Sequence, residues 1–321
     1  MNQYRAPWWL PGGHAQTIVP ARMLPASKVR YRRERWDAPD GDFIDVDFVT
    51  AEPSSPSAPL MVLFHGLEGD SRSHYSRILM QGCARRSWLG MVVHFRGCSG
   101  EPNRLPRAYH SGDSEEVDWI LRRVAMRWPL ARRFAVGISL GGNVLAKWAA
   151  ERGQMANGIV SACATISAPF DLVAGGRSLD RGVNVVYSRL FLRTMRAKAV
   201  AKAHRFAGLV DVRKVTESSS MFAFDDAFTA PVHGFSGALD YWRRASAKPL
   251  LAAIAVPTLT LNARNDPIVP FDSLPGPGEV SRYVQQEAPP EGGHVGFFSQ
   301  QRGSDCWYLR ERVFHFFQKG T

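Results

Sequence analysis

The feature that most constrains the fold of this chain is a regular alternation of short apolar runs with amphipathic stretches. A short apolar run predicts a strand that is buried on both faces, and a helical stretch between two such runs predicts a crossover connection. This pattern is typical of βαβ units, which build a mostly parallel central sheet flanked by helices. The sequence therefore predicts an α/β fold with expected strands at residues 60–64, 91–95, 134–138, 159–167, 257–261 and 281–286.

One crossover helix carries its own start signal. Asp113 is followed three residues later by Glu116, which is the spacing of a capping box. The apolar residues that follow repeat at helical spacing; they are Val117, Ile120, Leu121 and Val124. We expect this helix to cover one face of the sheet.

The segment of residues 170–247 interrupts the alternation. It contains a long helical run at residues 184–204, followed by loops rich in aromatic and acidic residues. A chain of 321 residues with 45% hydrophobic content can bury one large core. We therefore expect residues 1–321 to form a single domain with a helical cap inserted at about residues 170–247.

The long helical run allows two interpretations. Its apolar residues are expected to line one face; they are Tyr187, Leu190, Phe191 and Met195. Its cations lie elsewhere on the helix; they are Arg189, Arg193, Arg196, Lys198 and Lys202. The run is either a lid helix with a solvated basic face, or a helix that rests on an anionic membrane while lipid reaches the site. The second interpretation implies peripheral membrane contact through the cap.

The charge of the chain bears on its partners. The formal net charge of +11 raises the question of an acidic partner. The basic residues are scattered, without the clustered run that marks a nucleic-acid interface, so we expect a solvated basic surface and no nucleic-acid binding.

Cysteine usage and the N-terminal sequence bear on the compartment. The four cysteines stand far apart and form no CxxC pair; they are Cys83, Cys98, Cys163 and Cys306. Reduced thiols in a cytoplasmic protein fit this spacing. The N-terminus lacks the apolar stretch of a signal peptide, and no run reaches the length of a membrane span, so we expect a soluble protein.

A nucleophile motif lies between an expected strand and an expected helix. The segment Gly137-Ile138-Ser139-Leu140-Gly141 follows an apolar strand and precedes a helical pattern that includes Val144, Leu145 and Trp148. A nucleophile elbow needs small neighbours around a strained turn, which leaves the serine oxygen exposed. The alternative is a glycine-rich strand-to-helix turn without catalytic function. The context favours Ser139 as a nucleophile.

A serine nucleophile needs a histidine base and a carboxylate that orients the histidine. In folds with this elbow, the acid and then the histidine follow the serine, each on a loop at the carboxyl end of a late strand. Asp266 directly follows the expected strand 257–261, and His294 lies in a glycine-rich loop after the expected last strand. The order Ser139, Asp266, His294 therefore predicts a catalytic triad.

Other residues compete for these roles. Asp266 is also placed to cap a turn, as aspartates before proline often do. Asp272 and Asp226 are the reserve acids. The other histidines after the serine are His204, His233 and His315.

Acyl transfer also requires amide donors that face the developing oxyanion. Leu140 supplies the amide that follows the nucleophile, and Gly66 allows a turn that would point the amide of Leu67 inward. His65 is expected to hold this loop by hydrogen bonds. No HExxH pair or His/Cys cluster indicates a metal site, and nothing indicates a cofactor.

With these residues identified, the chain resembles the YheT-like branch of the α/β-hydrolases, also called the AB-hydrolase-4 family. The resemblance spans nearly the whole chain. Its marks are Pro7-Trp8-Trp9-Leu10-Pro11-Gly12-Gly13-His14-Ala15-Gln16-Thr17, His65-Gly66-Leu67-Glu68-Gly69, His94-Phe95-Arg96-Gly97-Cys98-Ser99-Gly100, the elbow, Phe224-Asp225-Asp226, His233-Gly234-Phe235 and Gly292-Gly293-His294-Val295-Gly296-Phe297.

The resemblance implies an α/β-hydrolase fold and a carboxylic-ester hydrolase whose family serine, aspartate and histidine fall on Ser139, Asp266 and His294. Relatives are linked to short- and medium-chain esters, monoacylglycerols and phospholipids, and some transfer the acyl group to an alcohol. Eukaryotic relatives carry an N-terminal membrane anchor, which we expect this chain to lack. The Trp8-Trp9 and Asp225-Asp226 motifs have no expected chemical role beyond core packing and loop bracing.

Three functions remain open at this stage. The leading one is hydrolysis of short- to medium-chain acyl esters or monoacylglycerol-like substrates through an acyl-enzyme on Ser139. The second is an acyltransferase, in which an alcohol intercepts the same acyl-enzyme. The third is a non-catalytic binding protein on a hydrolase fold, because a fold does not determine a function. The sequence makes no prediction of the oligomeric state.

Overall fold

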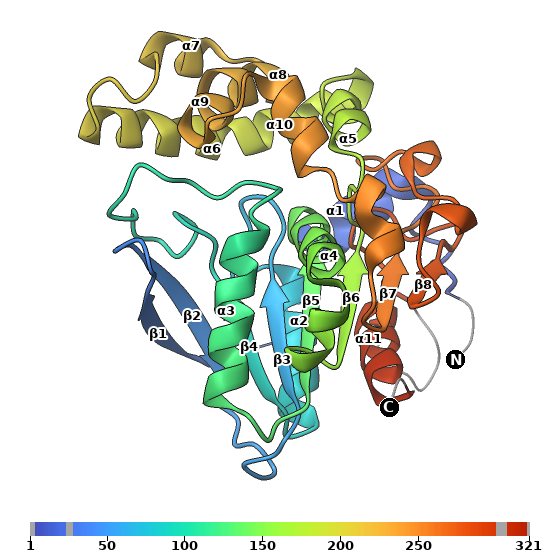
Figure 1. The fold of residues 1–321 in the computed structure, drawn as a ribbon. Coiled ribbons are helices and arrows are strands. Elements are labelled where there is room, and N and C mark those ends of the chain that lie inside the picture. Colours follow the sequence, from blue (N-terminus) through green and yellow to red (C-terminus); the bar gives the residue numbers. More distant parts are fainter. Residues whose placement is uncertain (1–3, 24–27, 300–306, 320–321) are drawn as a thin grey trace.

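The central sheet of the protein has eight strands. The computed structural model describes residues 4–23, 28–299 and 307–319. The strand order is β1-β2-β4-β3-β5-β6-β7-β8, with β3 to β8 parallel and the β1–β2 and β2–β4 pairs antiparallel (Figure 1). The strands are β1 (Tyr31–Asp37), β2 (Phe43–Val49), β3 (Leu60–Phe64), β4 (Leu89–Val93), β5 (Arg133–Ile138), β6 (Ala162–Ile166), β7 (Thr258–Leu261) and β8 (Val284–Glu287). The predicted α/β fold with a mostly parallel sheet is confirmed.

All six predicted strands are present; β3 has the predicted bounds, and the ends of the others are shifted by up to three residues. The run expected at residues 91–95 begins and ends two residues earlier, and the one expected at 281–286 is β8, Val284–Glu287. Strands β1 and β2 were not predicted. Their polar residues pair across the hairpin: Arg33 bonds to Asp47, and Arg35 bonds to Asp45. Both carboxylates are buried, at positions where a buried strand is expected to have apolar side chains.

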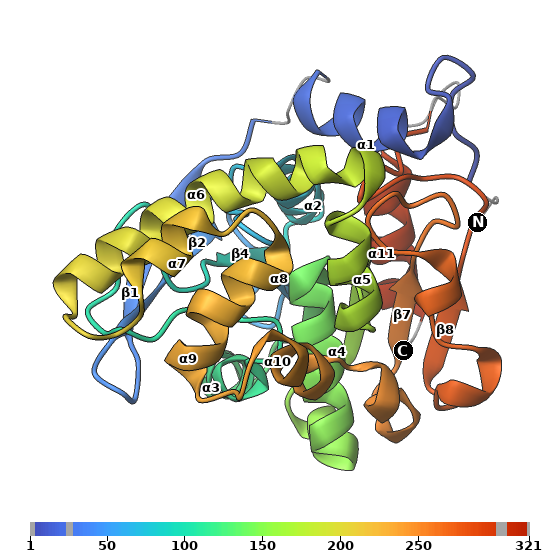
Figure 2. The ribbon, with the colours of Figure 1, turned by 90° about the horizontal axis from the view of Figure 1, so that it is seen from above.

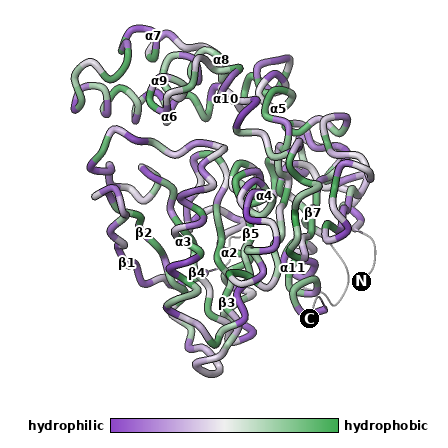
Figure 3. The backbone as a smooth tube through the Cα atoms, viewed as in Figure 1, coloured by the Kyte–Doolittle hydropathy of each residue, from purple (hydrophilic) through white to green (hydrophobic). Residues whose placement is uncertain are grey.

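Helices cover both faces of the sheet. Because successive side chains of a strand point to opposite faces, β3 contributes to two cores. Leu60, Val62 and Phe64 pack on the side of α3 (Ser114–Arg127) and α4 (Leu140–Arg152). Met61 and Leu63 pack on the side of α2 (His74–Arg85) and α11 (Tyr308–Lys319). The central strands stand out as the hydrophobic layer in Figure 3.

The predicted start of α3 is confirmed, since the Asp113 side chain accepts a hydrogen bond from the amide of Glu116. Shorter elements connect the layers. They are α1 (Gly12–Arg22), η1 (Gly153–Gly158), η4 (Lys248–Ala253), η5 (Phe271–Ser273) and η6 (Pro277–Glu279).

A helical segment lies between β6 and β7 in the chain. It covers the carboxyl end of the sheet (Figure 1), and its apolar residues form a core of their own. Its elements are α5 (Leu172–Leu179), η2 (Gly182–Asn184), α6 (Val185–Arg205), α7 (Val212–Glu217), α8 (Met221–Phe224), the π-helical turn η3 (Asp225–Thr229), α9 (Ala230–His233) and α10 (Ala238–Ala245). We call these elements the cap segment. Their interpretation as an insertion in a single domain stays a prediction.

Within residues 4–23, 28–299 and 307–319, no helix is both long and apolar enough to cross a membrane. Cys83, Cys98 and Cys163 are buried free thiols, and Cys306 lies outside the described residues. In the same part of the chain, no group of three His, Cys, Asp or Glu side chains is placed to hold a metal ion. The cytoplasmic location stays a prediction.

Candidate active site

The turn at Ser139 has the geometry that the motif predicts. Ser139 lies between the end of β5 and the first residue of α4, with φ 51° and ψ −117°. A positive φ is strained for a residue with a side chain. The neighbouring glycines allow the backbone to pack closely around the turn. A Cβ on Gly137 would lie 2.4 Å from the Gly141 oxygen, and one on Gly141 would lie 2.4 Å from the Phe64 oxygen. Both positions require glycine.

Three predicted residues meet at this turn. The His294 Nε2 lies 3.0 Å from the Ser139 Oγ, and the His294 Nδ1 lies 2.8 Å from the Asp266 Oδ2. An ionised carboxylate only accepts hydrogen bonds, so Nδ1 carries the proton and Nε2 is left to accept from the serine hydroxyl. The side chains come from the ends of β5, β7 and β8, which lie along one edge of the sheet. A histidine oriented in this way is placed to act as a base toward Ser139.

Asp266 also caps a turn. Its Oδ1 accepts hydrogen bonds from the amides of Ile268, at 2.8 Å, and Val269, at 3.0 Å. The two interpretations of this aspartate are therefore compatible, because one oxygen fixes the loop and the other faces His294. The turn holds the carboxylate in place for the histidine.

The competing residues lie outside this chain of hydrogen bonds. Asp272 is exposed in η5, and Asp226 is exposed and accepts from the amide of Ala238. The three other histidines are on α6, α9 and α11; they are His204, His233 and His315.

Two amides close to the nucleophile have no acceptor among the described residues. A Cβ on Gly66 would lie 3.2 Å from the Ser139 Cβ, so the loop after β3 passes directly against the serine. The other amides of this loop are used: those of Gly66 and Glu68 donate to the hydroxyls of Tyr75 and Tyr109, and that of Gly69 donates to the Gly66 oxygen. Within the described residues, the amide of Leu67 has no acceptor. Leu140 begins α4, so its amide has no intrahelical acceptor either.

His65 holds this loop in place, as predicted. Its Nε2 accepts from the amide of Phe95 at 3.1 Å, so Nδ1 carries the proton and donates to the Gly66 oxygen at 2.7 Å. Burial lowers the pKa of His65 to about 3. A neutral, fully hydrogen-bonded imidazole is structural and is not available as a base.

Helix α1 holds the acid and histidine loops together, which the sequence did not predict. The Gln16 Oε1 accepts from Asn265 Nδ2, at 2.9 Å, and from the amide of Gly292, at 2.8 Å. The Thr17 Oγ1 accepts from the amide of His294 at 2.8 Å. A Cβ on Gly13 would lie 1.9 Å from the Asn265 oxygen, so the helix sits directly on the acid loop.

Two roles were expected of the N-terminal motif: core packing and loop bracing. Core packing is wrong for Trp8, which is 91% exposed, and Trp9 is 37% exposed. Loop bracing is correct for the N-terminal motif as a whole, through its glycine, glutamine and threonine. The only sequence signal for this role was that residues 12–22 form a helical segment without apolar periodicity. The structure shows that two polar side chains of this helix, Gln16 and Thr17, are buried.

The triad opens into a cavity of about 1300 Å³ beneath the cap segment. Ser139, Leu140, Leu67 and His294 contribute to its lining. The predicted apolar face of α6 also lines it, through Tyr187, Leu190, Phe191 and Met195. The apolar lining beside the nucleophile is suited to an acyl chain.

Most of the α6 cations are not solvated as expected. Lys198 pairs with Glu68 at 2.8 Å, and Lys202 donates to the oxygens of Leu105 and Arg107. Burial lowers the pKa of Lys202 to about 8. Arg196 donates to the oxygens of Thr216 and Ser218. Lys198 is exposed but paired, whereas Arg189 and Arg193 are exposed and have no carboxylate partner among the described residues.

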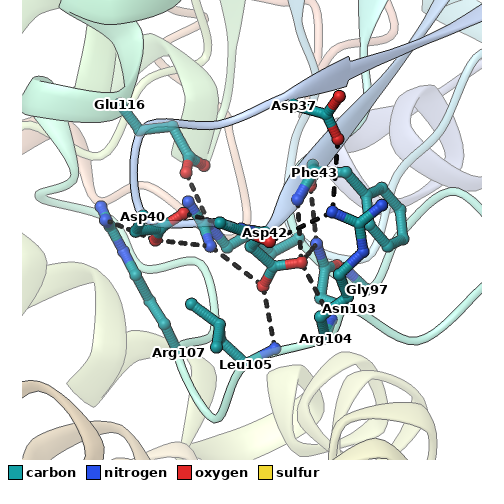
Figure 4. Close-up of polar contacts among 12 residues, drawn as sticks. Asp37, Asp40, Asp42, Phe43, Gly97, Asn103, Arg104, Leu105, Arg107 and Glu116 are labelled. Atoms are coloured by element: carbon teal, nitrogen blue, oxygen red, sulfur yellow. Dashed lines mark hydrogen bonds and ion pairs between the residues drawn. The ribbon is translucent and has the colours of Figure 1, made fainter.

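A buried polar network holds the loop of residues 96–107 (Figure 4), part of which lines the cavity. Asp42 accepts from the side chains of Arg96 and Asn103 and from the amides of Phe43, Arg104 and Leu105. Glu116 bonds to the Arg96 Nε at 2.6 Å. The loop carries Arg96 and Asn103 into the lining of the cavity. Asp42 therefore fixes one wall of the cavity from a position outside it.

The Asp225-Asp226 pair divides its roles. Asp225 is buried in the cavity wall, where it accepts from Thr229 Oγ1 at 2.6 Å and Trp242 Nε1 at 2.7 Å. Burial raises the pKa of Asp225 to about 6. Asp226 accepts from the Ala238 amide at the start of α10. The pair fastens the π-helical turn to α10 on one side of the cavity.

Comparison with known proteins confirms the fold class. A family model described as alpha/beta hydrolase fold matches residues 59–301. The chain is similar to YheT of Escherichia coli (strain K12), whose name assigns it provisionally as an esterase, with 39% identity over 94% of this chain and 88% of the relative. It is also similar to the human phospholipase ABHD3, with 28% identity over 95% of this chain and 76% of the relative. Among solved structures, the Pyrococcus furiosus esterase Pf2001 superposes with a TM-score of 0.56 at 12% identity, over 99% of this chain and 98% of that chain.

Proposed function

Since this chain belongs to the alpha/beta hydrolase family, we propose that it hydrolyses carboxylic esters through an acyl-enzyme formed on Ser139. The observation that carries the proposal is the unbroken chain of hydrogen bonds from Asp266 through His294 to Ser139, beside an apolar cavity. This arrangement matches the requirements of a serine nucleophile with an oriented base.

The first half of the reaction forms the acyl-enzyme. The Ser139 Oγ attacks the ester carbonyl carbon while the His294 Nε2 takes the hydroxyl proton. The developing oxyanion accepts hydrogen bonds from the amides of Leu67 and Leu140. When the tetrahedral intermediate collapses, the bond to the alcohol oxygen breaks and His294 returns the proton to that oxygen.

The second half releases the acid. Water attacks the acyl carbon while the His294 Nε2 takes its proton, and the bond to the Ser139 Oγ breaks as that oxygen is protonated again. Asp266 orients the imidazole and stabilises its charged form in both halves. The residues complete this cycle without a cofactor.

The substrate class follows from the cavity and from the relatives. A cavity of about 1300 Å³ is larger than is needed for an acetyl group, and its lining includes the apolar face of α6. Relatives are named as a phospholipase and a monoacylglycerol lipase, whose substrates carry acyl esters. We therefore propose short- to medium-chain acyl esters, including monoacylglycerol-like esters, as substrates.

Steady-state turnover of p-nitrophenyl esters from acetyl to palmitoyl tests the proposal. Ser139→Ala is expected to lower kcat by more than about 10³-fold, because the nucleophile is lost. Ser57→Ala changes an exposed serine whose hydroxyl bonds to that of Ser55, and it is expected to keep full activity. Unchanged turnover in Ser139→Ala would contradict the proposal.

Acyl transfer uses the same acyl-enzyme with a different acceptor. An alcohol would have to outcompete water beneath the cap segment. Product analysis with added glycerol separates the two reactions: free acid alone indicates hydrolysis, and a new ester indicates transfer.

A further inference from the structure

The mouth of the cavity is apolar and exposed. Four apolar side chains both line the cavity and remain open to solvent: Ile18 (45% exposed), Val183 (68%), Val186 (57%) and Leu190 (51%). Ile18 belongs to α1, and the others to η2 and α6. No other large exposed apolar side chain among the described residues lines this cavity. Exposed apolar side chains that gather at one place mark a surface that meets an apolar partner.

Helix α1 lies next to the amino-terminal end of α6 when the molecule is seen from above (Figure 2). The ring of His14, on α1, stacks on that of Tyr187, on α6, with 5.8 Å between ring centroids and 10° between planes. The His14 Nδ1 also lies 3.0 Å from the Tyr187 hydroxyl. The apolar rim therefore spans α1, η2 and α6, and α1 and α6 touch each other.

The rim also carries positive charge without compensating acids. Arg22, Arg189 and Arg193 are exposed, and none has a carboxylate partner in the part of the chain that the structure describes. Residues 1–33 and residues 181–210 contain no Asp or Glu at all. On an ideal helix Val186, Arg189, Leu190 and Arg193 span an arc of about 100°, so the charges flank the apolar side chains on one face. We call Ile18, Arg22, Val183, Val186, Arg189, Leu190 and Arg193 the mouth patch.

We propose that the mouth patch docks onto an anionic lipid surface, with the apolar side chains in the headgroup region and the arginines on lipid phosphates. Apolar area and basic charge on one amphipathic face add up in binding of this kind. A nucleic acid would engage the arginines but would leave the apolar side chains in water. A symmetric dimer would place the same patch, and the same unpaired arginines, against each other. Lipid is the partner that satisfies both properties of the patch.

Docking places the cavity mouth against the lipid. An ester that leaves the lipid surface then reaches Ser139 without crossing water, and this route of access rests on the proposed function. Binding itself does not. Ser139→Ala is expected to bind vesicles as the unaltered protein does, so a failure of catalysis and a failure of docking are distinguishable.

Flotation of the full chain with lipid vesicles at low salt tests docking. Binding is expected to vesicles that mix phosphatidylglycerol with phosphatidylcholine, and much weaker binding to phosphatidylcholine alone. Arg189→Gln with Arg193→Gln is expected to weaken binding to the anionic vesicles roughly 30-fold. Neither arginine lines the cavity, so turnover of p-nitrophenyl acetate is expected to stay unchanged.

A matched pair of apolar variants tests the location. Val183→Ser with Val186→Ser and Leu190→Ser is expected to weaken binding at least tenfold. The control is Met126→Ser with Leu130→Ser and Met155→Ser, which changes side chains of similar exposure near the amino ends of β5 and β6, at the opposite edge of the sheet. The control is expected to bind like the unaltered protein. Equal loss in both triple variants, no flotation with anionic vesicles, or a dimer formed through the patch in light scattering would each overturn the proposal.

Discussion

Among single residues, the least expected feature is that side chains of α1 form hydrogen bonds to the loops that carry Asp266 and His294. Thr17 is neither a base nor a nucleophile, yet its hydroxyl accepts from the amide of His294 and donates to the Gly13 oxygen. A shift of the imidazole by a fraction of an ångström would lengthen its bond to Ser139. Thr17 is therefore a positioning residue.

Thr17→Val keeps the shape of the side chain and removes both hydrogen bonds. We expect kcat for p-nitrophenyl butyrate to fall about tenfold with little change in KM, because the histidine is less well placed while the cavity is unchanged. Thr17→Ser restores the hydroxyl and is expected to recover most of the loss. Equal loss in both variants, or none in Thr17→Val, would remove Thr17 from this role.

Asp225 provides a prediction about pH. Burial raises its pKa from 3.8 to about 6. Between these two pH values, the carboxyl is protonated in the folded protein and ionised in the unfolded chain. This group therefore lowers the free energy of unfolding as pH rises from about 4 to about 6. Asp225→Asn removes the titration, so the stability advantage of the unaltered protein over the variant is expected to be larger at pH 4 than at pH 7.

Urea unfolding of both proteins at the two pH values measures that difference. Carboxylates with lowered pKa values, such as Glu34, oppose this trend in the absolute stability, but they are common to both proteins and cancel. A difference between the two proteins that does not depend on pH would contradict the assignment.

At the scale of elements, the Asp42 network connects the β1–β2 turn to the loop that walls the cavity. Asp42→Ala leaves Arg96 buried without one of its carboxylates and leaves several amides without acceptors. We expect a loss of about 3–5 kcal/mol in the free energy of unfolding.

The control for this prediction is Asp37→Ala. Asp37 also bonds to the network, through Arg104 at 3.2 Å, but its side chain is 81% exposed. Its removal is expected to change the free energy of unfolding by less than about 0.5 kcal/mol. If both variants lost a similar amount of unfolding free energy in urea, burial would not explain how the network stabilises the protein.

The elements also show what the sequence could and could not predict. Strands β3 to β7 were predictable because strands buried on both faces read as apolar runs. Strand β8 lies at the edge of the sheet and is polar and partly exposed, so it has no such run. Strands β1 and β2 were not predictable, because their paired arginines and aspartates give them the polar composition of a loop. The role of α1 was not predictable either, since its bonds join residues between 249 and 277 positions apart.

At the scale of the whole molecule, the parallel sheet assembles the site. Ser139, Asp266 and His294 follow β5, β7 and β8, which lie in the same half of the sheet with β6 between β5 and β7. Their loops therefore meet at one edge although the residues lie far apart in sequence. Chain order and strand ends were enough to select these residues. The cavity and its mouth were not predictable, because they depend on how the cap segment and α1 pack over that edge.

The proposed function requires Ser139 to be an activated nucleophile. Treatment with a fluorophosphonate, followed by intact-mass measurement and peptide mapping, tests it most directly. One covalent adduct is expected on the peptide that contains Ser139, none in Ser139→Ala, and strongly slowed labelling in His294→Ala. Labelling that persists in Ser139→Ala, or no labelling of the folded protein, would contradict it.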